Sequence, residues 1–366
     1  MDESQPLLSQ RPRSQPRNNN WIYAIGISIT AAIALTIYFS KPSVQFSVPT
    51  TVLHPPQKGA ISDFPNLNLS WYNIAQMQSI IDVEMDQIAV TCTGDIKCVV
   101  AVDEWEGSGI KMDYVIQSLD LIGVNNLKIS QTVKNGRYFF SLQSFKKPTK
   151  PQQMLYVNFK LPKDHDYDFD LDGDNGSLFY DSIAKGTGMI EARLLQGDVY
   201  IKNAVSNLFY FNVDSGNLTL QNLVAGSSVY ARTSAGPINI TVEFTNSRYG
   251  SVELQSNAGL ISGRISEYDE LLVRSDAGNI NLDLVPGYNG GNSDTYVYCD
   301  AGVINNRVYG FSGLYDVESV VGGVLVSIFG KIMHKPYGVI SGEITNSKSL
   351  YKSKISAGPN TVHFFK

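Results

Sequence analysis

The C-terminal half of the chain repeats a short phrase that constrains its fold more than any other feature. An Asp, Asn or Ser is followed by a small residue and a Gly, and two residues later usually by Ile or Leu. The corner glycines are Gly216, Gly236, Gly259, Gly278 and Gly302, with a last copy at Gly358. The first five are separated by 20, 23, 19 and 24 residues. A period of this size predicts stacked structural repeats.

Each repeat predicts two short strands that flank a glycine corner. Examples are Ser228–Arg232 before Gly236 and Ile238–Val242 after it, and the same pattern surrounds Gly278. Gly permits a positive φ or close packing at the corner. We expect the preceding Asp, Asn or Ser to accept hydrogen bonds from corner N–H groups, and the following Ile or Leu to point inward. One unit cannot bury its apolar face alone, so the units must stack.

Composition agrees with strands and tight turns. The 366 residues include 31 Gly, 20 Tyr and 16 Phe, a bias that favours strands over helices. The net charge of -5 argues against a nucleic-acid partner, because binding a phosphate backbone needs a basic patch.

The stretch from Phe311 to Gly342 departs from the repeat, so regular stacking is not expected there.

Residues 67–154 predict a first, membrane-proximal β-rich region before the repeats. Asn135-Gly136 is typical of a hairpin turn, here between strands at Leu127–Val133 and Tyr138–Leu142. The sequence from Lys146 to Pro151 then predicts a linker to the repeats, which occupy residues 155–366.

The chain has three cysteines, whose pairing depends on the redox state of the compartment. Cys92 and Cys98 flank a predicted turn, so in an oxidising lumen we expect a disulfide that closes a hairpin between Ile88–Thr91 and Lys97–Val102. Cys299 lies alone within a repeat strand. A buried structural thiol is the favoured interpretation, and an intermolecular bridge is the alternative.

The N-terminal part predicts a membrane anchor. Trp21–Phe39 is an apolar stretch of 19 residues without a charge, and as a helix it would be about 28 Å long. Three arginines precede it and only Lys41 follows closely, which predicts a cytosolic tail at residues 1–20 and a lumenal or extracellular part from residue 40. A cleaved signal peptide ending at Ala32-Ile33-Ala34 is the alternative, but the apolar run continues beyond it. Prolines at residues 40–66 predict an extended stalk.

The cytosolic tail and the lumenal part carry further signals. Glu3 stands four residues before Leu7-Leu8, as in the acidic-dileucine signals that clathrin adaptors bind on endosomal and vacuolar cargo. We therefore expect a vacuolar or endosomal membrane, or the plasma membrane. The predicted lumenal part has four N-glycosylation sequons, at Asn68, Asn175, Asn217 and Asn239.

An aspartate run just before the first strong repeats suggests a calcium site. On a strand its acidic side chains would share one face, and a bound Ca²⁺ would relieve their repulsion. A helical calcium hand does not fit, because its twelfth position would be Phe179 where a Glu is required. A solvated outer face on an edge strand is the alternative. The candidate metal ligands are Asp166, Asp168, Asp170, Asp172 and Asp174.

Catalytic patterns are weak. The repeat acids Asp214, Asp276 and Asp300 could stack on one corner, and a glycosidase needs a pair of carboxylates. Ser234 and Asn257 occupy the same register, however, which favours turn capping over acid–base chemistry. The histidines show no metal or catalytic spacing; they are His54, His165, His334 and His363.

The sequence from Val157 to Pro162, followed by the Ser-Ala-Gly and Asp-Ala-Gly corners, resembles the adhesin-like toast-rack family of unknown function. The resemblance covers roughly residues 155–366. It implies a right-handed, single-stranded β-solenoid and supplies no catalytic residues.

The sequence therefore predicts an all-β chain with a single N-terminal transmembrane helix. The expected role is non-catalytic binding or scaffolding, with a glycan or a protein surface as ligand and no cofactor other than calcium. The alternative function is a carbohydrate-active β-helix enzyme that uses clustered aspartates.

Overall fold

The computed structural model describes residues 72–81, 85–94, 96–118, 127–144, 153–163, 167–185, 188–245, 250–287, 293–345 and 348–366. The predicted tail, anchor, stalk and interdomain linker lie outside these residues, as do Asn68 and Asp166. Within the described ranges, no helix is long and apolar enough to cross a bilayer. All regular elements there are strands.

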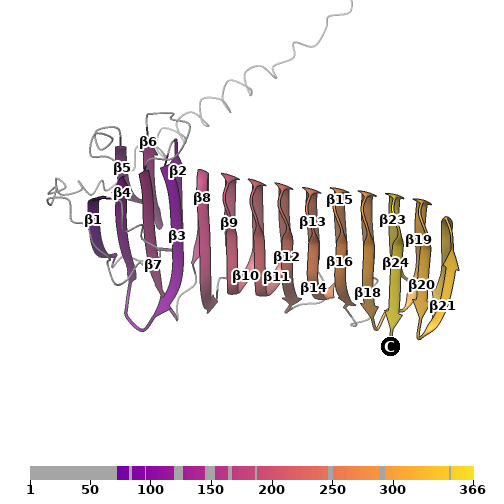
Figure 1. Ribbon diagram of the computed structural model, residues 1–366. Helices are drawn as coiled ribbons and strands as arrows, with labels where there is room; N and C mark the ends of the chain where they lie inside the picture. Colours follow the sequence, from indigo (N-terminus) through magenta and orange to yellow (C-terminus); the bar gives the residue numbers. More distant parts are fainter. Residues whose placement is uncertain are drawn as a thin grey trace, which may run out of the picture. The chain divides into compact units, whose positions relative to one another are not determined.

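The strands form two facing sheets, and each coil of the chain contributes one strand to each sheet (Figure 1). We call the strands that follow the glycine corners sheet I and those that precede them sheet II. In spatial order, sheet I contains β1 (Tyr72–Ile81), β4 (Ile110–Ser118), β7 (Gln153–Pro162), β3 (Ile96–Trp105), the second half of β8 (Asp168–Lys185), the first halves of β10 (Val199–Ser215) and β11 (Leu218–Ala235), β12 (Ile238–Phe244), β14 (Ile261–Tyr268), β16 (Ile280–Pro286), β18 (Ile304–Tyr309), β24 (Asn360–Phe365), β20 (Val324–Ile328) and β21 (Lys331–Lys335).

Sheet II follows the same order of coils. It contains β5 (Leu127–Lys134), β6 (Arg137–Ser144), β2 (Gln87–Thr93), the first half of β8, β9 (Met189–Gln196), the second halves of β10 and β11, β13 (Ser251–Ala258), β15 (Glu270–Ala277), β17 (Asp294–Ala301), β23 (Ser349–Ala357), β19 (Gly313–Val321) and β22 (Gly338–Ile344). From β8 to β19 the neighbours in sheet II run parallel. The predicted strands around Gly236 and Gly278 are confirmed.

The corner glycines stack directly on one another. A Cβ atom added to Gly216 would lie 1.6 Å from the carbonyl oxygen of Gly197, and one added to Gly278 would lie 2.1 Å from that of Gly259. The backbone bonds continue through the corner, since the Gly278 N–H donates to the Ala301 carbonyl at 3.0 Å. Only glycine fits at position 278, because a side chain there would clash with the Gly259 carbonyl. The φ of Gly278 is not positive, so the backbone conformation is not the reason.

The polar residue that precedes each corner glycine does not cap it as predicted. Asp214, Asp276 and Asp300 are exposed, and the corner N–H groups are occupied by carbonyls of the next coil. Side-chain acceptors come instead from the residue after the glycine. Asn279 Oδ1 accepts from the Val303 N–H at 3.0 Å, and Asp198 Oδ1 accepts from the Asn217 N–H at 2.9 Å.

Small hydroxyl side chains next to the corners form hydrogen bonds to the corner carbonyls. Thr233 and Ser256 donate to the carbonyls of Gly216 and Gly236 at 3.3 and 3.2 Å. Cys299 occupies the same register position and its thiol lies 3.3 Å from the Gly278 carbonyl. Cys299 is buried and free, so the prediction of a buried thiol is confirmed.

The irregular stretch after Phe311 changes the winding order. After β18 the chain makes the coil β19–β20 and then an antiparallel excursion, β21 and β22. It returns as β23–β24, which lie between the β17–β18 coil and the β19–β20 coil. The last coil is therefore inserted inside the stack, and Figure 1 shows the C-terminus between earlier strands. The expectation that simple stacking fails here is confirmed.

Buried amides fix the register of the inserted coil. Asn306 Nδ2 donates to Tyr351 Oη at 3.0 Å, and the Leu282 N–H donates to Asn306 Oδ1 at 3.2 Å. Asn360 Nδ2 donates to the Glu318 carbonyl at 2.9 Å. Asn306, Tyr351 and Asn360 are fully buried. A register slip would leave these groups unpaired, which is costly in an apolar interior.

The N-terminal end also changes the winding order, and it corrects the prediction of a cysteine hairpin. The Cys92–Cys98 disulfide is present, but β2 and β3 do not form a hairpin. Both Cys side chains are buried, and their strands lie in opposite sheets, where β2 pairs with β6 and β8 and β3 pairs with β7 and β8. The bridge thus closes a coil corner. The β-rich region shares both sheets with the repeats, while the Asn135-Gly136 hairpin is confirmed.

Replacing Gly278 with Ala tests the glycine column. The new methyl group would press on the Gly259 carbonyl, so we expect the free energy of unfolding of the full-length chain to fall by about 3 kcal/mol. Gly310→Ala is the control, because no atom lies within 4 Å of its added Cβ and only the positive φ of 66° opposes it. That control should cost about 1 kcal/mol. Equal losses in urea unfolding would contradict the close-approach explanation.

Candidate binding face on sheet II

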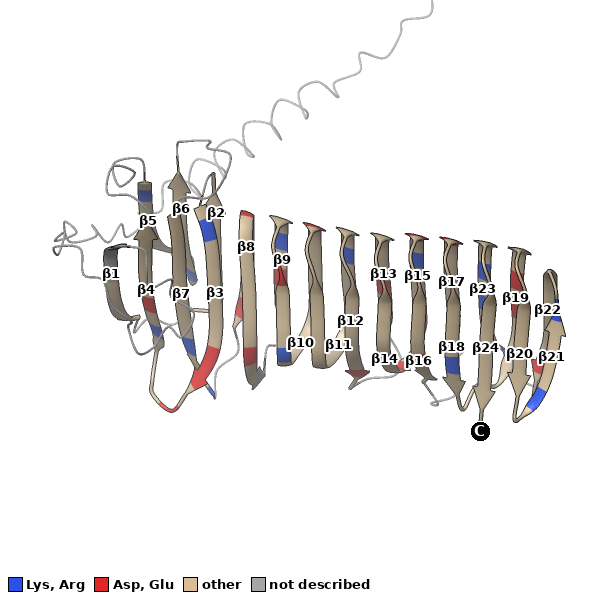
Figure 2. Cartoon of the chain, in the orientation of Figure 1, with Lys and Arg blue, Asp and Glu red and all other residues tan. Residues whose placement is uncertain are grey.

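The outer face of sheet II carries side chains in straight rows, because neighbouring strands pair without a shift. The fourth residue before a corner glycine forms one row, whose two ends are acids, Asp172 on β8 before Gly176 and Glu318 on β19 before Gly322. Between these acids lies a stretch of the row that crosses seven strands. We call this stretch the donor row, since each member has an N–H or O–H donor and none is a carboxylate. In order, it consists of Arg193, Asn212, Arg232, Gln255, Arg274, Tyr298 and Lys354. Figure 2 shows basic segments recurring at one level of these stacked strands.

A second row lies beside the donor row and contains several tyrosines. Tyr210 and Tyr230 stack with ring centroids 4.8 Å apart, and the Arg193 guanidinium lies 5.4 Å from the Tyr210 ring centre. Tyr296 packs beside Tyr298 of the donor row at 6.5 Å. These contacts hold the aromatic side chains in fixed positions.

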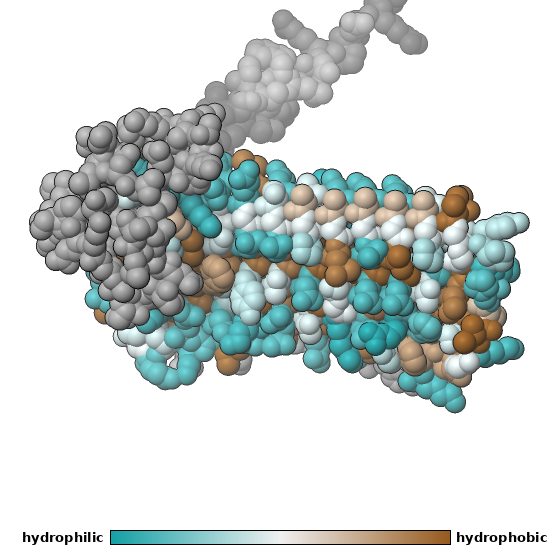
Figure 3. Space-filling model, in the orientation of Figure 1, coloured by the Kyte–Doolittle hydropathy of each residue, from teal (hydrophilic) through white to brown (hydrophobic). Residues whose placement is uncertain are grey.

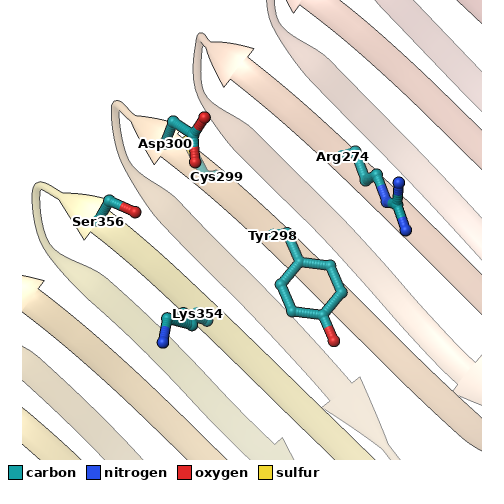
Figure 4. Close-up of a pocket in the computed structure, with 6 residues that line it drawn as sticks. All are labelled: Arg274, Tyr298, Cys299, Asp300, Lys354 and Ser356. Carbon is teal, nitrogen blue, oxygen red and sulfur yellow. The ribbon is translucent and has the colours of Figure 1, made fainter.

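A shallow hollow of ≈ 380 Å³ lies on the same face, across β15, β17 and β23 (Figure 4). Arg274, Tyr298 and Lys354 line it from the donor row, and Asp300 and Ser356 line it beside the corner. The hollow therefore offers donors on one side and acceptors on the other.

The predicted acid row runs along the corner edge of this face. Asp276 and Asp300 belong to adjacent coils and share a register position, whereas Asp214 is separated from them by the coils of Ser234 and Asn257. All three aspartates are exposed. Beside them runs an exposed row of alanines, seen as a weakly apolar line in Figure 3; it consists of Ala235, Ala258, Ala277, Ala301 and Ala357.

The aspartate run lies on β8, where Phe169 and Leu171 point inward and Asp168, Asp170 and Asp172 point outward, as predicted. The alternative prediction of an edge strand is wrong, because β8 pairs on both sides. Asp168 accepts a hydrogen bond from the Met189 N–H at 2.8 Å, and Asp174 from the Gly94 N–H at 2.7 Å. Among the described residues, no group of three His, Cys, Asp or Glu is placed to hold a metal. Calcium binding stays a prediction.

An acid pair lies at the β8 end of the same face. Asp170 neighbours Glu191 across the β8–β9 pair, and Arg193 forms an ion pair with the buried Glu191 carboxylate. Burial raises the pKa of Asp170, an effect that Arg193 opposes and Asp172 reinforces. Burial and the Asp170 charge raise the pKa of Glu191. The pair therefore favours the protonated state more than exposed carboxyls would.

The remaining predicted residues fall in three places. Asn217 and Asn239 are exposed, Asn217 at a corner and Asn239 on the outer face of sheet I, while Asn175 is half-buried near the first corner. Glu3, Leu7 and Leu8 lie outside the described residues. The prediction did not include the donor row. Aligning the repeats on their glycines reveals it, because Arg232 and Arg274 both stand four residues before a corner glycine.

Stacked coils that build two facing sheets define a β module made of repeats. Residues 118–310, just over half of the chain, match the family model Toastrack DUF4097. The chain belongs to the Toastrack DUF4097 family, which confirms the toast-rack resemblance.

Solved structures from three bacteria are also similar. Two are each described as a "putative adhesin". The one from Bacteroides fragilis is 15% identical, covers 79% of this chain and 96% of its own, and has a TM-score of 0.36. The one from Parabacteroides distasonis is 12% identical with the same coverages and a TM-score of 0.32. A "putative cell adhesion protein" from Clostridium sporogenes is 11% identical, covers 79% of this chain and 98% of its own, and has a TM-score of 0.23. No curated protein matches the chain.

Replacing Asp170 with Asn tests the acid pair. The raised pKa values mean that the folded state binds protons more tightly than the unfolded state, whose carboxyls keep ordinary values of 3.8 and 4.5. The contribution of the pair is fully present below those values and is lost as the pH rises through the raised ones. We therefore expect Asp170→Asn to raise the melting temperature of the full-length chain at pH 7 and to change it little at pH 3.

The exposed Asp214 supplies the control for that experiment. Asp214→Asn removes the same charge at a corner distant from the pair and should leave the pH dependence of melting unchanged. If Asp170→Asn lowers the melting temperature at pH 7, the interpretation of a strained acid pair is wrong.

Proposed function

We propose that this chain is a type II single-pass membrane protein whose adhesin-like domain binds an extended ligand without catalysis. The observation that carries the proposal is the outer face of sheet II, where seven adjacent strands present side chains in register. A flat face with a repeating pattern suits a ligand that itself extends and repeats.

The anchor and stalk give this face a place to act. Trp21–Phe39 would hold the chain in the membrane, and the prolines of residues 40–66 would keep the folded part away from the bilayer. The membrane is vacuolar, endosomal or plasma membrane in this proposal, with the Leu7-Leu8 signal binding a clathrin adaptor on the cytosolic side.

Two of the predicted glycans would leave the proposed face open. Asn239 lies on the outer face of sheet I, in register with Thr219 and Ser262. Asn217 lies at an exposed corner. A glycan at Asn239 favours ligand binding on sheet II, since sheet II faces the opposite direction, and a glycan at Asn217 would project from the corner edge.

The alternative is a carbohydrate-active enzyme that uses the acid row. Asp276 and Asp300 are neighbours on adjacent coils, which is the observation that favours it. Their exposure favours a binding role instead, because glycosidase acids are commonly shielded from water so that one stays protonated.

A polysaccharide panel distinguishes binding from catalysis. We expect the full-length chain to retain polysaccharides without releasing new reducing ends. The double variant Asp276→Asn with Asp300→Asn should still retain them, because the Asn side chain that replaces Asp300 keeps a hydrogen-bond acceptor at the rim of the hollow. Reducing ends that appear with the native chain and disappear with the folded double variant would establish the enzyme and refute the proposal.

Protease protection in sealed microsomes tests the topology. Protease added outside should remove only a tag at the N-terminus, because the predicted anchor leaves residues 1–20 in the cytosol. Asn239→Gln should reduce the apparent mass by one glycan, whereas Asn281→Gln, on the same outer face but outside a sequon, should not. Digestion of a C-terminal tag in sealed vesicles would contradict the topology.

A further inference from the structure

We propose that the donor row of sheet II binds a linear acidic polysaccharide that runs along the stack of coils, with Arg232 and Arg274 as its main anion-binding groups. This inference rests on the proposed binding function and names the chemical class of the ligand.

The chemistry of the row is the first argument. All seven side chains of the row are able to donate hydrogen bonds, and four of them are cationic. A planar guanidinium binds carboxylate or sulfate through two parallel hydrogen bonds, while Gln, Asn and Tyr bind neutral hydroxyl and ring oxygens. The row therefore matches a chain that combines anionic groups with many neutral oxygens.

The two central arginines are available for such a ligand. Within the described part of the chain, Arg193 pairs with Glu191, Lys354 with Glu318 at 3.1 Å, and Arg307 on sheet I with Asp283 at 2.8 Å. No acidic side chain of the described residues forms an ion pair with Arg232 or Arg274. An anion that binds there displaces no internal partner.

The spacing also fits a polymer. Arg232 and Arg274 are two coils apart with Gln255 between them. Because neighbouring strands are about 4.8 Å apart, the two arginines should repeat at about 10 Å, and the whole row should span about 29 Å. A linear polysaccharide with an acidic group on alternate sugars would place anions at both arginines.

The hollow lies at one end of this path. Arg274 and Lys354 flank Tyr298 there, and the three side chains come from consecutive strands of sheet II (Figure 4). A sugar ring in the hollow would meet the Tyr298 hydroxyl and two cations. Asp300 and Ser356 at its rim can accept hydrogen bonds from sugar hydroxyls.

Acidic side chains border the row and limit what it accepts. Asp276 and Asp300 lie on the corner side, and Glu270 and Asp294 lie at the opposite ends of the same strands. Glu253 lies in the tyrosine row. These acids would repel a broad polyanion such as a duplex nucleic acid, so the ligand must be a single narrow chain.

Binding of defined polymers to the detergent-purified, full-length chain tests the inference. The probes are oligogalacturonate and a heparin oligosaccharide as acidic saccharides, cello-oligosaccharide as a neutral one, and polyglutamate as an acidic non-saccharide. We expect at least one acidic saccharide to bind at least tenfold more tightly than the other two probes. Arg232→Gln and Arg274→Gln should each weaken that binding about tenfold, the loss of one charge-assisted contact.

Arg264→Gln is the matched control, because Arg264 lies on β14 of sheet I, outside the donor row, and its Nε donates to Ser266 of the same strand at 3.4 Å. It removes the same charge and should leave binding unchanged. Equal losses from Arg264→Gln and Arg274→Gln, or equal binding of polyglutamate and the acidic saccharides, would refute the inference. Failure of every acidic saccharide to bind would refute it as well.

The outcome also separates this inference from the proposed function. Cello-oligosaccharide could bind more tightly than the acidic saccharides and lose this binding in Arg274→Gln. That result would refute the acidic ligand but support a binding role for sheet II. Release of reducing ends from any probe would sink the binding role itself.

Discussion

The contact between a corner glycine and the carbonyl oxygen of the coil before it governs this structure. At Gly216 and Gly278 the neighbouring carbonyl occupies the space that a side chain would need. This approach lets the backbone bonds of both sheets continue through the corner, as the Gly278 N–H does to Ala301. If one corner widened, the two strands that it joins would lose their common register. The rows on the outer face exist because the register is kept.

A stack of parallel strands must also end, and both ends use antiparallel strands and a change in winding order. At the C-terminal end β21 and β22 run antiparallel to their neighbours, and the final coil lies inside them. Lys335 on β21 donates to the Val339 carbonyl at 2.6 Å. Charged residues on an end strand discourage addition of another chain. The buried amides of Asn306 and Asn360 then make the inserted position the favoured one, since only there are both satisfied.

The sequence predicts the local features of this fold but not the spatial order of its strands. Gly236 and Gly278 mark true corners, and the alternation around them places Ile238 and Ile280 inside. These features depend on residues that are close in the sequence, so a periodic pattern predicts them. The pairing of Cys92 with Cys98 was also predictable, but the hairpin was not found. Their short separation suits a hairpin and a coil corner equally, and only pairing with the distant β6, β7 and β8 decides between them.

The proposed binding face was not predicted from the sequence, for a related reason. Each residue of the donor row is a common polar residue type, and only its neighbours on adjacent coils make it part of a row. Arg232 and Arg274 are 42 positions apart in the chain and two strands apart in the sheet. The calcium prediction came from a short local pattern instead, because its aspartates alternate within residues 166–174. In the structure Asp168 accepts a hydrogen bond from the Met189 N–H, and Asp174 accepts one from the Gly94 N–H.

Rigidity would help the proposed face of sheet II to bind a polymer through contacts that are individually weak. Exposed charged contacts contribute little individually, because water and salt screen them and ordering a long side chain costs entropy. Here the strands are fixed by two sheets, and the stacked Tyr210 and Tyr230 are fixed by each other. Less ordering remains when a ligand binds, so several modest contacts along one polymer can act together. A change at the glycine corners would thus weaken binding without altering any residue that touches the ligand.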